Sequence, residues 1–390
     1  MLTKHFYSSF STDQPMVCDR TTPATNDYLL SHTLSRIVAP NIPSALIGSS
    51  GWNHIYQTVQ SLPSQLTITK GFGFECPLQS SLPQADILLC IGEEGRGILA
   101  ENNNINLLPE TFQVHPIWQR VCNFCTQWAD PSSPLFDKID QIWLEFDVNP
   151  EPAPIPLPSV FFDFFEYSIL PGGGYQWVSQ TALKLLLGRV LSPEVEQCLF
   201  NCFESLPSGA DVFTIGAMLA RDSDVVRVCM GLAPAEIIPY LNRIGWQGDT
   251  DELEALVCEL ANVASSLVID LDVCHRVLPK VGLECYVRTK TETEQLLDYL
   301  VKKGLCLPEK RDRILAYPGY IHQRQNPQQW PSYLKWQASF LKRGYLSTFA
   351  KRLNHIKVVY QPYQDLIAKA YLALWHHWLP DPKLHQQKKL

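Results

Sequence analysis

Hydrophobic and polar positions along the chain follow two different periods. In one set of segments apolar residues recur every three to four positions, which is the pattern of an amphipathic helix. These segments are 51–60, 116–127, 176–190, 194–205, 234–243, 250–264, 292–303, 331–343 and 363–378. Between them lie short runs in which apolar and polar residues alternate, and this period of two predicts strands with one buried face.

Some of the predicted helices carry recognisable ends. Ser192 followed by Pro193 predicts an N-cap and a proline in the first turn. Thr291 and Glu294 have the spacing of a capping box, and Gly304 is placed to end the same helix. These signals support the helical interpretation of the segments that they flank.

The strand-like runs come in closely spaced pairs. The pairs are QLTITKGFGFEC with DILLCIG, IWLEFDV with SVFFDFF, DVFTIGAMLA with VVRVCMGL, and LVIDLDV with KVGLECYV, while HIKVVYQP has no evident partner. Such pairs are antiparallel hairpins, because a parallel connection requires a crossover of about a dozen residues or more. The chain therefore repeats a unit of helix, hairpin and helix about five times.

Two hairpins carry acidic residues at matching positions. LEFDV (144–148) aligns with IDLDV (269–273), and the strands that follow them also match. The aligned acids are Glu145 with Asp270, Asp147 with Asp272, and Asp163 with Glu284. Since side chains alternate along a strand, these acids share one face and apolar residues occupy the other. Helices on the apolar face and closure of the sheet would direct the acids inward, whereas an open sheet would leave them solvated.

The predicted fold is a single α+β domain over residues 25–380, with an N-terminal extension (1–24) and a C-terminal tail (381–390). About five helix–hairpin–helix repeats form an antiparallel β-barrel of roughly ten strands surrounded by helices. This element order resembles that of the αββα (ABBA) prenyltransferases. The passages VVRVCMGLAPAEIIPYL and HIKVVYQPYQDLIAKAYL are similar to the strand-then-helix passages of that family.

The resemblance implies a function inside the barrel. The expected enzyme is a transferase of natural-product biosynthesis, which moves a prenyl group from an isoprenoid diphosphate to an aromatic, guanidine-bearing or peptide acceptor. The family holds the diphosphate with Lys, Arg and Tyr side chains, often as Arg-x-Lys-x-Tyr on one strand. Here Cys229 and Gly231 follow Arg227 on the same face, so this chain departs from that pattern.

The candidate site consists of the charged and aromatic residues of the inward face. Its charged members are Glu75, Glu145, Asp147, Asp163, Asp270, Asp272 and Glu284 together with Arg227, Lys280 and Lys357. The resemblance implies that the three bases bind the diphosphate. Glu75 is counted with the substrate contacts, as are Phe161 and Tyr286, whose rings would shield a carbocation.

The carboxylates suggest two further roles. Mg²⁺ takes one or two carboxylates together with phosphate oxygens, so Asp270, Asp272, Glu145 and Asp147 are the predicted ligands of a magnesium ion or of a cationic substrate group. Crowded carboxylates raise one another's pKa, and either Glu284 or Asp163 is then the expected general base. Two alternatives use the same acids: a non-catalytic binder of a cationic peptide or small molecule, and a metal-dependent or acid-initiated cyclase or hydrolase.

Charge and composition narrow the classes of protein. The formal net charge of -7 and the pI near 5.8 argue against nucleic acid as a partner. No apolar run reaches the roughly 20 residues of a membrane span, and the N-terminus lacks the apolar core of a signal peptide, so a cytoplasmic protein is expected. The 12 cysteines, Cys122 and Cys125 included, lie in apolar runs and are interpreted as core residues. Motifs typical of serine hydrolases, P-loop NTPases and dinucleotide-binding enzymes do not occur in the sequence.

Overall fold

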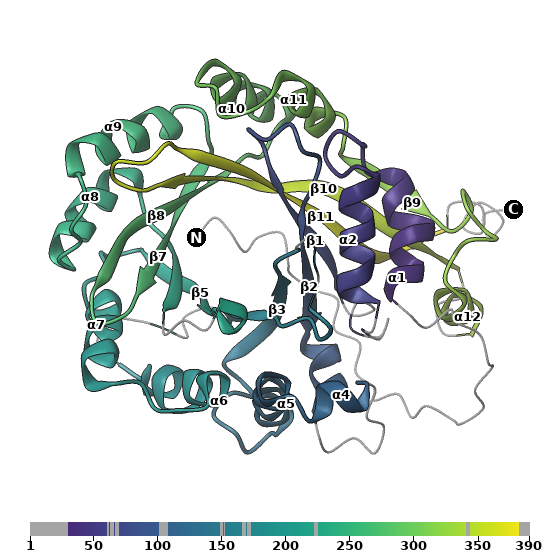
Figure 1. The fold of residues 1–390 in the computed structure, drawn as a ribbon, viewed down its shortest axis with the longest axis horizontal. Coiled ribbons are helices and arrows are strands. Elements are labelled where there is room, and N and C mark those ends of the chain that lie inside the picture. Colours follow the sequence, from purple (N-terminus) through teal and green to yellow (C-terminus); the bar gives the residue numbers. More distant parts are fainter. Residues whose placement is uncertain are drawn as a thin grey trace, which may run out of the picture.

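The strands of the chain close into a ring (Figure 1). The computed structural model describes residues 30–60, 62, 66, 70–100, 108–148, 151, 153–165, 169, 173–221, 225–340 and 344–381. Its 11-stranded sheet runs in the order β11-β1-β2-β3-β4-β5-β6-β7-β8-β10-β9, and β10 also pairs with β11. All of these pairings are antiparallel. The predicted barrel is therefore confirmed, with β9 attached to β10 outside the ring.

The strands and helices have the following bounds. The strands are β1 (Gly71–Pro77), β2 (Asp86–Gly92), β3 (Ile139–Phe146), β4 (Ser159–Phe164), β5 (Asp211–Ala217), β6 (Val226–Gly231), β7 (Ser266–Val273), β8 (Val277–Tyr286), β9 (Gly319–His322), β10 (Tyr345–Tyr360) and β11 (Ile367–Pro380). The helices are α1 (Leu30–Thr33), α2 (Ser49–Val59), α4 (Glu110–Gln113), α5 (Pro116–Ala129), α6 (Lys184–Leu187), α7 (Pro193–Glu204), α8 (Pro234–Arg243), α9 (Thr250–Ala261), α10 (Lys290–Lys302), α11 (Pro308–Leu315) and α12 (Ser332–Phe340). Short π-helical and 3₁₀ turns cover η2 (Leu34–Val38), η3 (Ala39–Asn41), η4 (Glu93–Ile98), η5 (Val178–Leu183) and η6 (Leu219–Arg221).

The main hydrophobic core lies between the barrel and the helices that surround it (Figure 1). On β7 the side chains of Ile269, Leu271 and Val273 are fully buried in this core, as the strand period predicts. Trp118 and Trp128 on α5 belong to the same core. Because the apolar side chains point outward, the polar residues between them point toward the barrel axis.

Most of the predicted helices are confirmed, but the last one is wrong. Residues 363–378 do not form a helix; they contribute to strand β11, which pairs with β10 along most of its length. Its Ala and Leu residues favour a helix locally, yet Ala368, Ala370, Leu372 and Leu374 are buried at every second position. The missing partner of HIKVVYQP is therefore β11, and the histidines His376 and His377 lie on a strand.

The helix ends agree with the prediction in one case and differ in another. The capping box of α10 uses Thr289 and Glu292, two residues before the predicted Thr291 and Glu294. Ser192 caps α7 as predicted, because its side chain accepts a hydrogen bond from the Val195 backbone N–H. The helix α11 was not predicted. The predicted extension (1–24) and residues 382–390 of the predicted tail lie outside the described residues.

The hairpin of β10 and β11 extends beyond the barrel. Residues 345–353 of β10 pair only with β11 and β9, and residues 376–380 of β11 pair only with β10. We call these two segments, together with β9 and α12, the outer flap; it lies to one side of the ring in Figure 1. No helix in the described part of the chain is long and apolar enough to cross a membrane.

Candidate active site

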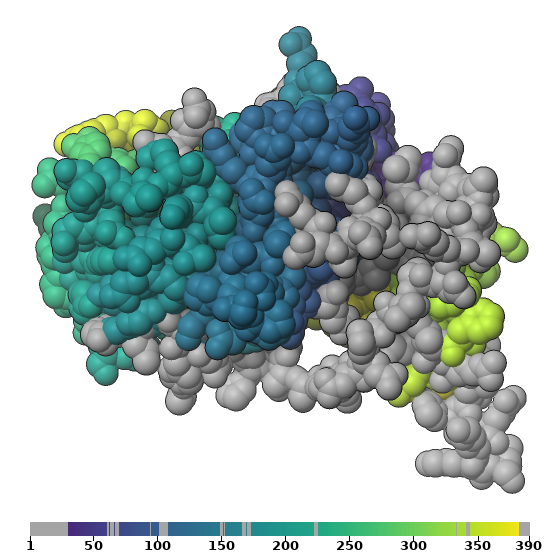
Figure 2. All heavy atoms as spheres, turned by 90° about the horizontal axis from the view of Figure 1, so that it is seen from below, coloured from purple at the N-terminus to yellow at the C-terminus, as the bar shows by residue number. Residues whose placement is uncertain are grey.

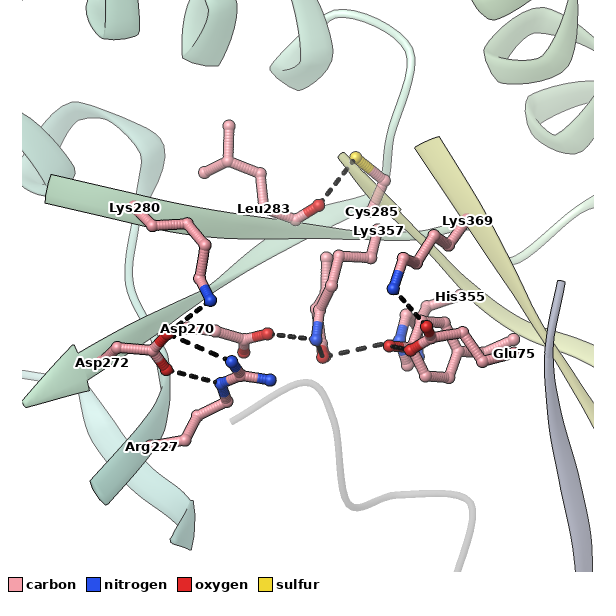
Figure 3. Close-up of polar contacts among 12 residues, drawn as sticks. Glu75, Arg227, Asp270, Asp272, Lys280, Leu283, Cys285, His355, Lys357 and Lys369 are labelled. Atoms are coloured by element: carbon pink, nitrogen blue, oxygen red, sulfur yellow. Dashed lines mark hydrogen bonds and ion pairs between the residues drawn. The ribbon is translucent and has the colours of Figure 1, made fainter. Parts of the chain in front are cut away.

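Lys357 lies at the centre of a buried polar cluster inside the barrel (Figure 3). Its side chain on β10 forms an ion pair with Asp270, and its Nζ lies 3.3 Å from Glu284 Oε1. The same Nζ is 5.2 Å from the centroid of the Tyr371 ring. Lys357 is 8% exposed and Asp270 4%, so both charges are largely removed from water.

Strand register brings these residues together. Lys357 lies opposite Glu284 on β8 and opposite Lys369 on β11. Asp270 on β7 lies opposite Gly282 on β8, where an added Cβ would come within 2.9 Å of Asp270 Oδ2. A glycine at position 282 thus leaves the room that the Asp270 carboxylate needs to reach Lys357.

Lys357 stays protonated despite its burial. Burial alone lowers the pKa of an ammonium group, but Asp270, Tyr371 and Glu284 outweigh it and raise the pKa of Lys357 well above its ordinary value. Within the described residues, this ion pair is the only polar contact of the Asp270 carboxylate. The pair is therefore mutually dependent: each charge is tolerated in the interior because the other is present.

A second ion-pair cluster lies beside the first (Figure 3). Arg227 donates from Nε and NH2 to the two oxygens of Asp272, at 2.8 and 3.2 Å. Lys280 Nζ lies 2.5 Å from Asp272 Oδ2. Burial would raise the pKa of Asp272, but Arg227 and Lys280 outweigh it, so the pKa is lowered and the carboxylate is ionised.

A third cluster on β1 and β11 was only partly predicted. Both Lys369 and the Tyr371 hydroxyl contact the carboxylate of Glu75. The ring of His355 stacks on Tyr371 with centroids 4.2 Å apart, and burial lowers the pKa of His355 to about 3. Lys369, Tyr371 and His355 are not among the predicted site residues, the first two because residues 363–378 were predicted to be a helix. The period-two spacing of Lys369, Tyr371 and Ala373 was the available signal of a strand.

Glu145 differs from the other interior acids. Its side chain on β3 faces the same side as Glu75, and it forms no hydrogen bond or ion pair with the described residues. Burial and the neighbouring Glu75 charge raise the pKa of Glu145 to about 7. Asp86, which the sequence analysis did not select, lies opposite Glu75, and burial raises its pKa to about 6. These are interior carboxyl groups able to exchange protons near neutral pH.

An aromatic and apolar section occupies another part of the inward face. Trp143 and Trp375 meet edge to face with centroids 5.6 Å apart, and Cys90 and Ala373 pack beside them, separate from the outer core. Phe161, predicted to face inward, lies opposite Trp143 on β3. The barrel interior therefore combines buried cations with aromatic rings.

The remaining predicted residues lie at the edges of these groups. Asp147 forms a bidentate ion pair with Arg221 just beyond the end of β3. The Tyr286 hydroxyl donates to Glu284 Oε2 at 2.9 Å, so Tyr286 belongs to the Lys357 cluster.

The predicted magnesium ligands do not form one group. Asp270 and Asp272 lie on β7, Glu145 and Asp147 lie on or just after β3, and β4, β5 and β6 separate these strands in the sheet. Among the described residues there is no group of three or more His, Cys, Asp or Glu side chains able to hold a metal ion. A metal site made by the protein alone therefore does not fit these residues.

Asp163, one of the two predicted bases, is held by three donors. Gln141 Nε2 and Trp143 Nε1 donate to Asp163 Oδ2 at 2.6 and 3.1 Å, and the Thr214 hydroxyl donates to Oδ1. This arrangement orients the Trp143 indole and leaves little of the carboxylate for a substrate proton.

We therefore expect the Asp163→Asn substitution to lower stability more than activity. The Asn side chain keeps one accepting oxygen, but its NH2 group replaces the other and cannot accept, so at least one of the present hydrogen bonds would be lost, at a cost of about 1–3 kcal/mol in the free energy of unfolding. Urea unfolding and turnover measured on the same preparation would check this. A loss of turnover above about a hundredfold at unchanged stability would instead identify Asp163 as the base.

Comparison with known proteins gives likeness of structure only. No protein-family model and no curated protein matches the chain. Prenyltransferase PriB in its apo form is 12% identical with a TM-score of 0.49, over 88% of this chain and 96% of that chain. AnaPT from Neosartorya fischeri is 13% identical (TM-score 0.48; 91% and 93% covered), and 5-dimethylallyltryptophan synthase from Streptomyces coelicolor is 13% identical (TM-score 0.46; 88% and 94% covered). At such identity the likeness concerns the fold, which the strand pairing of this chain establishes independently.

Proposed function

We propose that this protein is an enzyme that transfers a prenyl group from an isoprenoid diphosphate to an acceptor inside the barrel. The observation that carries the proposal is the inward cluster around Lys357, where Lys357 and Lys369 lie opposite one another on β10 and β11. The interior that holds these cations also holds the Trp143 and Trp375 rings. An allylic diphosphate has the same two parts, an anionic head and an apolar tail.

The cations would stabilise the leaving group. When the carbon–oxygen bond of the substrate breaks, the electron pair stays on the diphosphate, and Lys357, Lys369 and Arg227 would compensate the charge that develops there. The Tyr371 and Tyr286 hydroxyls, which donate to Glu75 and Glu284 in this structure, would have to turn away from these carboxylates to donate to the diphosphate oxygens. The carboxylate partners of Lys357 raise the pKa of its buried ammonium group, so this charge is present before the substrate arrives.

The aromatic rings and Glu145 would serve the second half of the reaction. The allylic cation left by ionisation is stabilised by the faces of Trp143, Trp375 and Phe161. A nucleophilic atom of the acceptor forms the new bond to carbon and must then lose a proton. We propose Glu145 as the group that takes it, since it has no other described partner and its pKa is raised to about 7.

Magnesium stays a prediction. One carboxylate, such as Asp270, together with diphosphate oxygens would be enough for Mg²⁺, which often binds through the substrate. The mechanism above uses no metal. Mg²⁺ dependence is best measured as part of the binding experiment.

The first experiment measures diphosphate binding without turnover. We expect geranyl S-thiolodiphosphate, which ionises poorly, to raise the melting temperature of the full chain, since a ligand that binds only the folded state stabilises it. Each titration is run with and without Mg²⁺. Turnover is then sought by mass spectrometry, with dimethylallyl and geranyl diphosphate and a panel of aromatic, guanidine-bearing and peptide acceptors. The absence of any shift with or without Mg²⁺ would refute the proposal.

A non-catalytic binder of cationic ligands is the second candidate. The observation that favours it is the two neighbouring carboxyl groups of Asp86 and Glu145, which form no ion pair with the described residues and which an ammonium or guanidinium group would neutralise. In the same melting assay, a shift with an arginine-rich peptide but not with the thiolodiphosphate would support this candidate.

A further inference from the structure

The outer flap carries positive charge only. Its residues include Lys335, Lys351 and Arg352 and no Asp or Glu, in a chain whose formal net charge is -7. Asp381, the carboxylate that follows β11, is 4% exposed and paired with Arg324. The outer flap is therefore positively charged, although the chain as a whole is acidic.

The same flap exposes large apolar side chains. Trp336 and Phe340, one turn apart on α12, are 53% and 63% exposed, and their rings lie 5.5 Å apart. The exposed Lys335 precedes Trp336 directly. Tyr345 and Leu379 are exposed at the open end of the β10–β11 hairpin, away from its turn. There Tyr345 lies opposite Pro380 and Leu346 lies opposite Leu379.

These exposed side chains lie on the outer flap, to one side of the ring (Figure 1). In Figure 2 the bright yellow-green atoms of the flap lie at one end of the molecule. Burying these rings in water-free surroundings would be favourable, and a monomeric soluble protein rarely leaves such a group of rings together in water. The flap therefore has the properties of an interaction surface.

We propose that the outer flap is a docking surface for an anionic lipid membrane. Trp, Tyr, Phe and Leu side chains insert at the boundary between headgroups and acyl chains, while Lys and Arg attract anionic headgroups. Each Lys or Arg near such a surface adds to the attraction, and the outer flap contains no carboxylate to oppose it. The occupant is a lipid surface of the peripheral kind, because α12 is only 9 residues long.

Charge distinguishes this occupant from a second copy of the chain. Since the flap holds cations and no acid, a copy seated flap to flap would bring like charges together. Nucleic acid would match the charge, yet it gains little from the exposed Leu379 and from rings that already lie tilted against one another. An anionic membrane would attract the cations through its headgroups and bury the apolar side chains near its acyl chains.

The test is co-sedimentation of the full chain with lipid vesicles. We expect binding to vesicles with about 30% phosphatidylserine to be at least about tenfold tighter than to pure phosphatidylcholine, and to weaken as salt is raised. The double substitution Trp336→Ala/Phe340→Ala should reduce this binding by about tenfold or more, and Lys335→Glu should reduce it less. The matched control is Val114→Ala/Val190→Ala, which removes side chains of similar exposure (67% and 62%) outside the flap.

Each outcome of these vesicle-binding experiments either supports the proposal or overturns it. Unchanged melting temperature with lost vesicle binding in the Trp336/Phe340 variant supports the proposal, since these residues are exposed and their removal leaves the fold intact. The proposal is overturned by equal binding to neutral and anionic vesicles, by no binding, or by binding of duplex DNA alone. It is also overturned if the chain is a dimer in solution that the Trp336/Phe340 variant dissociates. None of these measurements uses the prenyl-transfer assay, so the two proposals stand or fall separately.

Discussion

Replacing Lys357 by Met is expected to lower the free energy of unfolding by about 3–5 kcal/mol. The reason is that Asp270 would remain buried at 4% exposure without the ion pair that is its one polar contact among the described residues. Glu284 would lose a partner as well, although Tyr286 still donates to it. Urea unfolding at pH 7, followed by circular dichroism, measures the change.

The double substitution Lys357→Met/Asp270→Asn separates the missing cation from the buried anion. It removes both charges, so we expect it to recover at least half of the lost stability. Prenyl transfer should stay at least about a hundredfold below the level of the unsubstituted chain, and thiolodiphosphate binding should be lost, because the central cation is absent in both variants. A double variant that is as unstable as Lys357→Met would contradict the mutual dependence of the pair.

Lys303→Met is the matched control for the lysine. Lys303 on the surface also forms an ion pair, 2.6 Å from Glu259, but both side chains are more than 40% exposed. We expect this substitution to cost less than about 1 kcal/mol and to leave turnover unchanged. A comparable loss in both lysine variants would mean that burial does not decide the energy of the Lys357 pair.

The barrel could be predicted from the sequence because the signals for it, short hairpins and apolar runs at period two, are local and recur along the chain. Each predicted hairpin is short, and the outward faces of β3, β6 and β7 are continuous apolar runs at period two. The matching positions of the acids Glu145 and Asp270 in two hairpins indicated an inward polar face, and the strand register agrees with both side chains pointing inward. Closure itself depends on β11, which the local pattern did not identify.

The error at β11 arose because propensity and tertiary pairing disagree there. Residues such as Ala370, Leu372 and Leu374 are good helix formers, and only pairing with β1 and β10 makes them a strand. This error affected the predicted site. Lys369 and Tyr371 were not predicted as site residues, and the strand that pairs with β10 beside Lys357 was not identified. Which cation pairs with which acid depends on strand register across the ring, and no spacing in the sequence contains that information.

Replacing Glu145 by Gln is expected to lower kcat by about 10²–10⁴-fold while leaving the fold intact. Gln has the same shape as Glu, but it cannot accept the proton that the acceptor loses after the new bond forms. Because Glu145 has no described hydrogen bond or ion pair, its replacement leaves no partner unsatisfied. The control is Glu254→Gln on α9, where the side chain is exposed and no change in kcat is expected.

The pH dependence of Glu145 distinguishes a base from a structural residue. The ionised carboxylate is the active form, and burial and Glu75 raise its pKa to about 7. The kcat/KM of the unsubstituted chain should therefore rise about tenfold per pH unit below 7 and level off above it, whereas the residual rate of Glu145→Gln should lack this step. A profile that is unchanged in the variant would mean that another group takes the proton.

The same raised pKa predicts the sign of a stability change. A carboxyl group whose folded-state pKa exceeds its unfolded value binds its proton more tightly in the folded state. Its contribution is fully present below the ordinary value of 4.5 and is lost as the pH rises through about 7. Glu145→Gln, which is neutral at every pH, should thus match the unsubstituted chain near pH 4 and exceed it at pH 8 by about 1–3 kcal/mol in the free energy of unfolding. Lost turnover together with gained stability is a combination that damage to the fold cannot produce, so it would identify Glu145 as a residue kept for its chemistry.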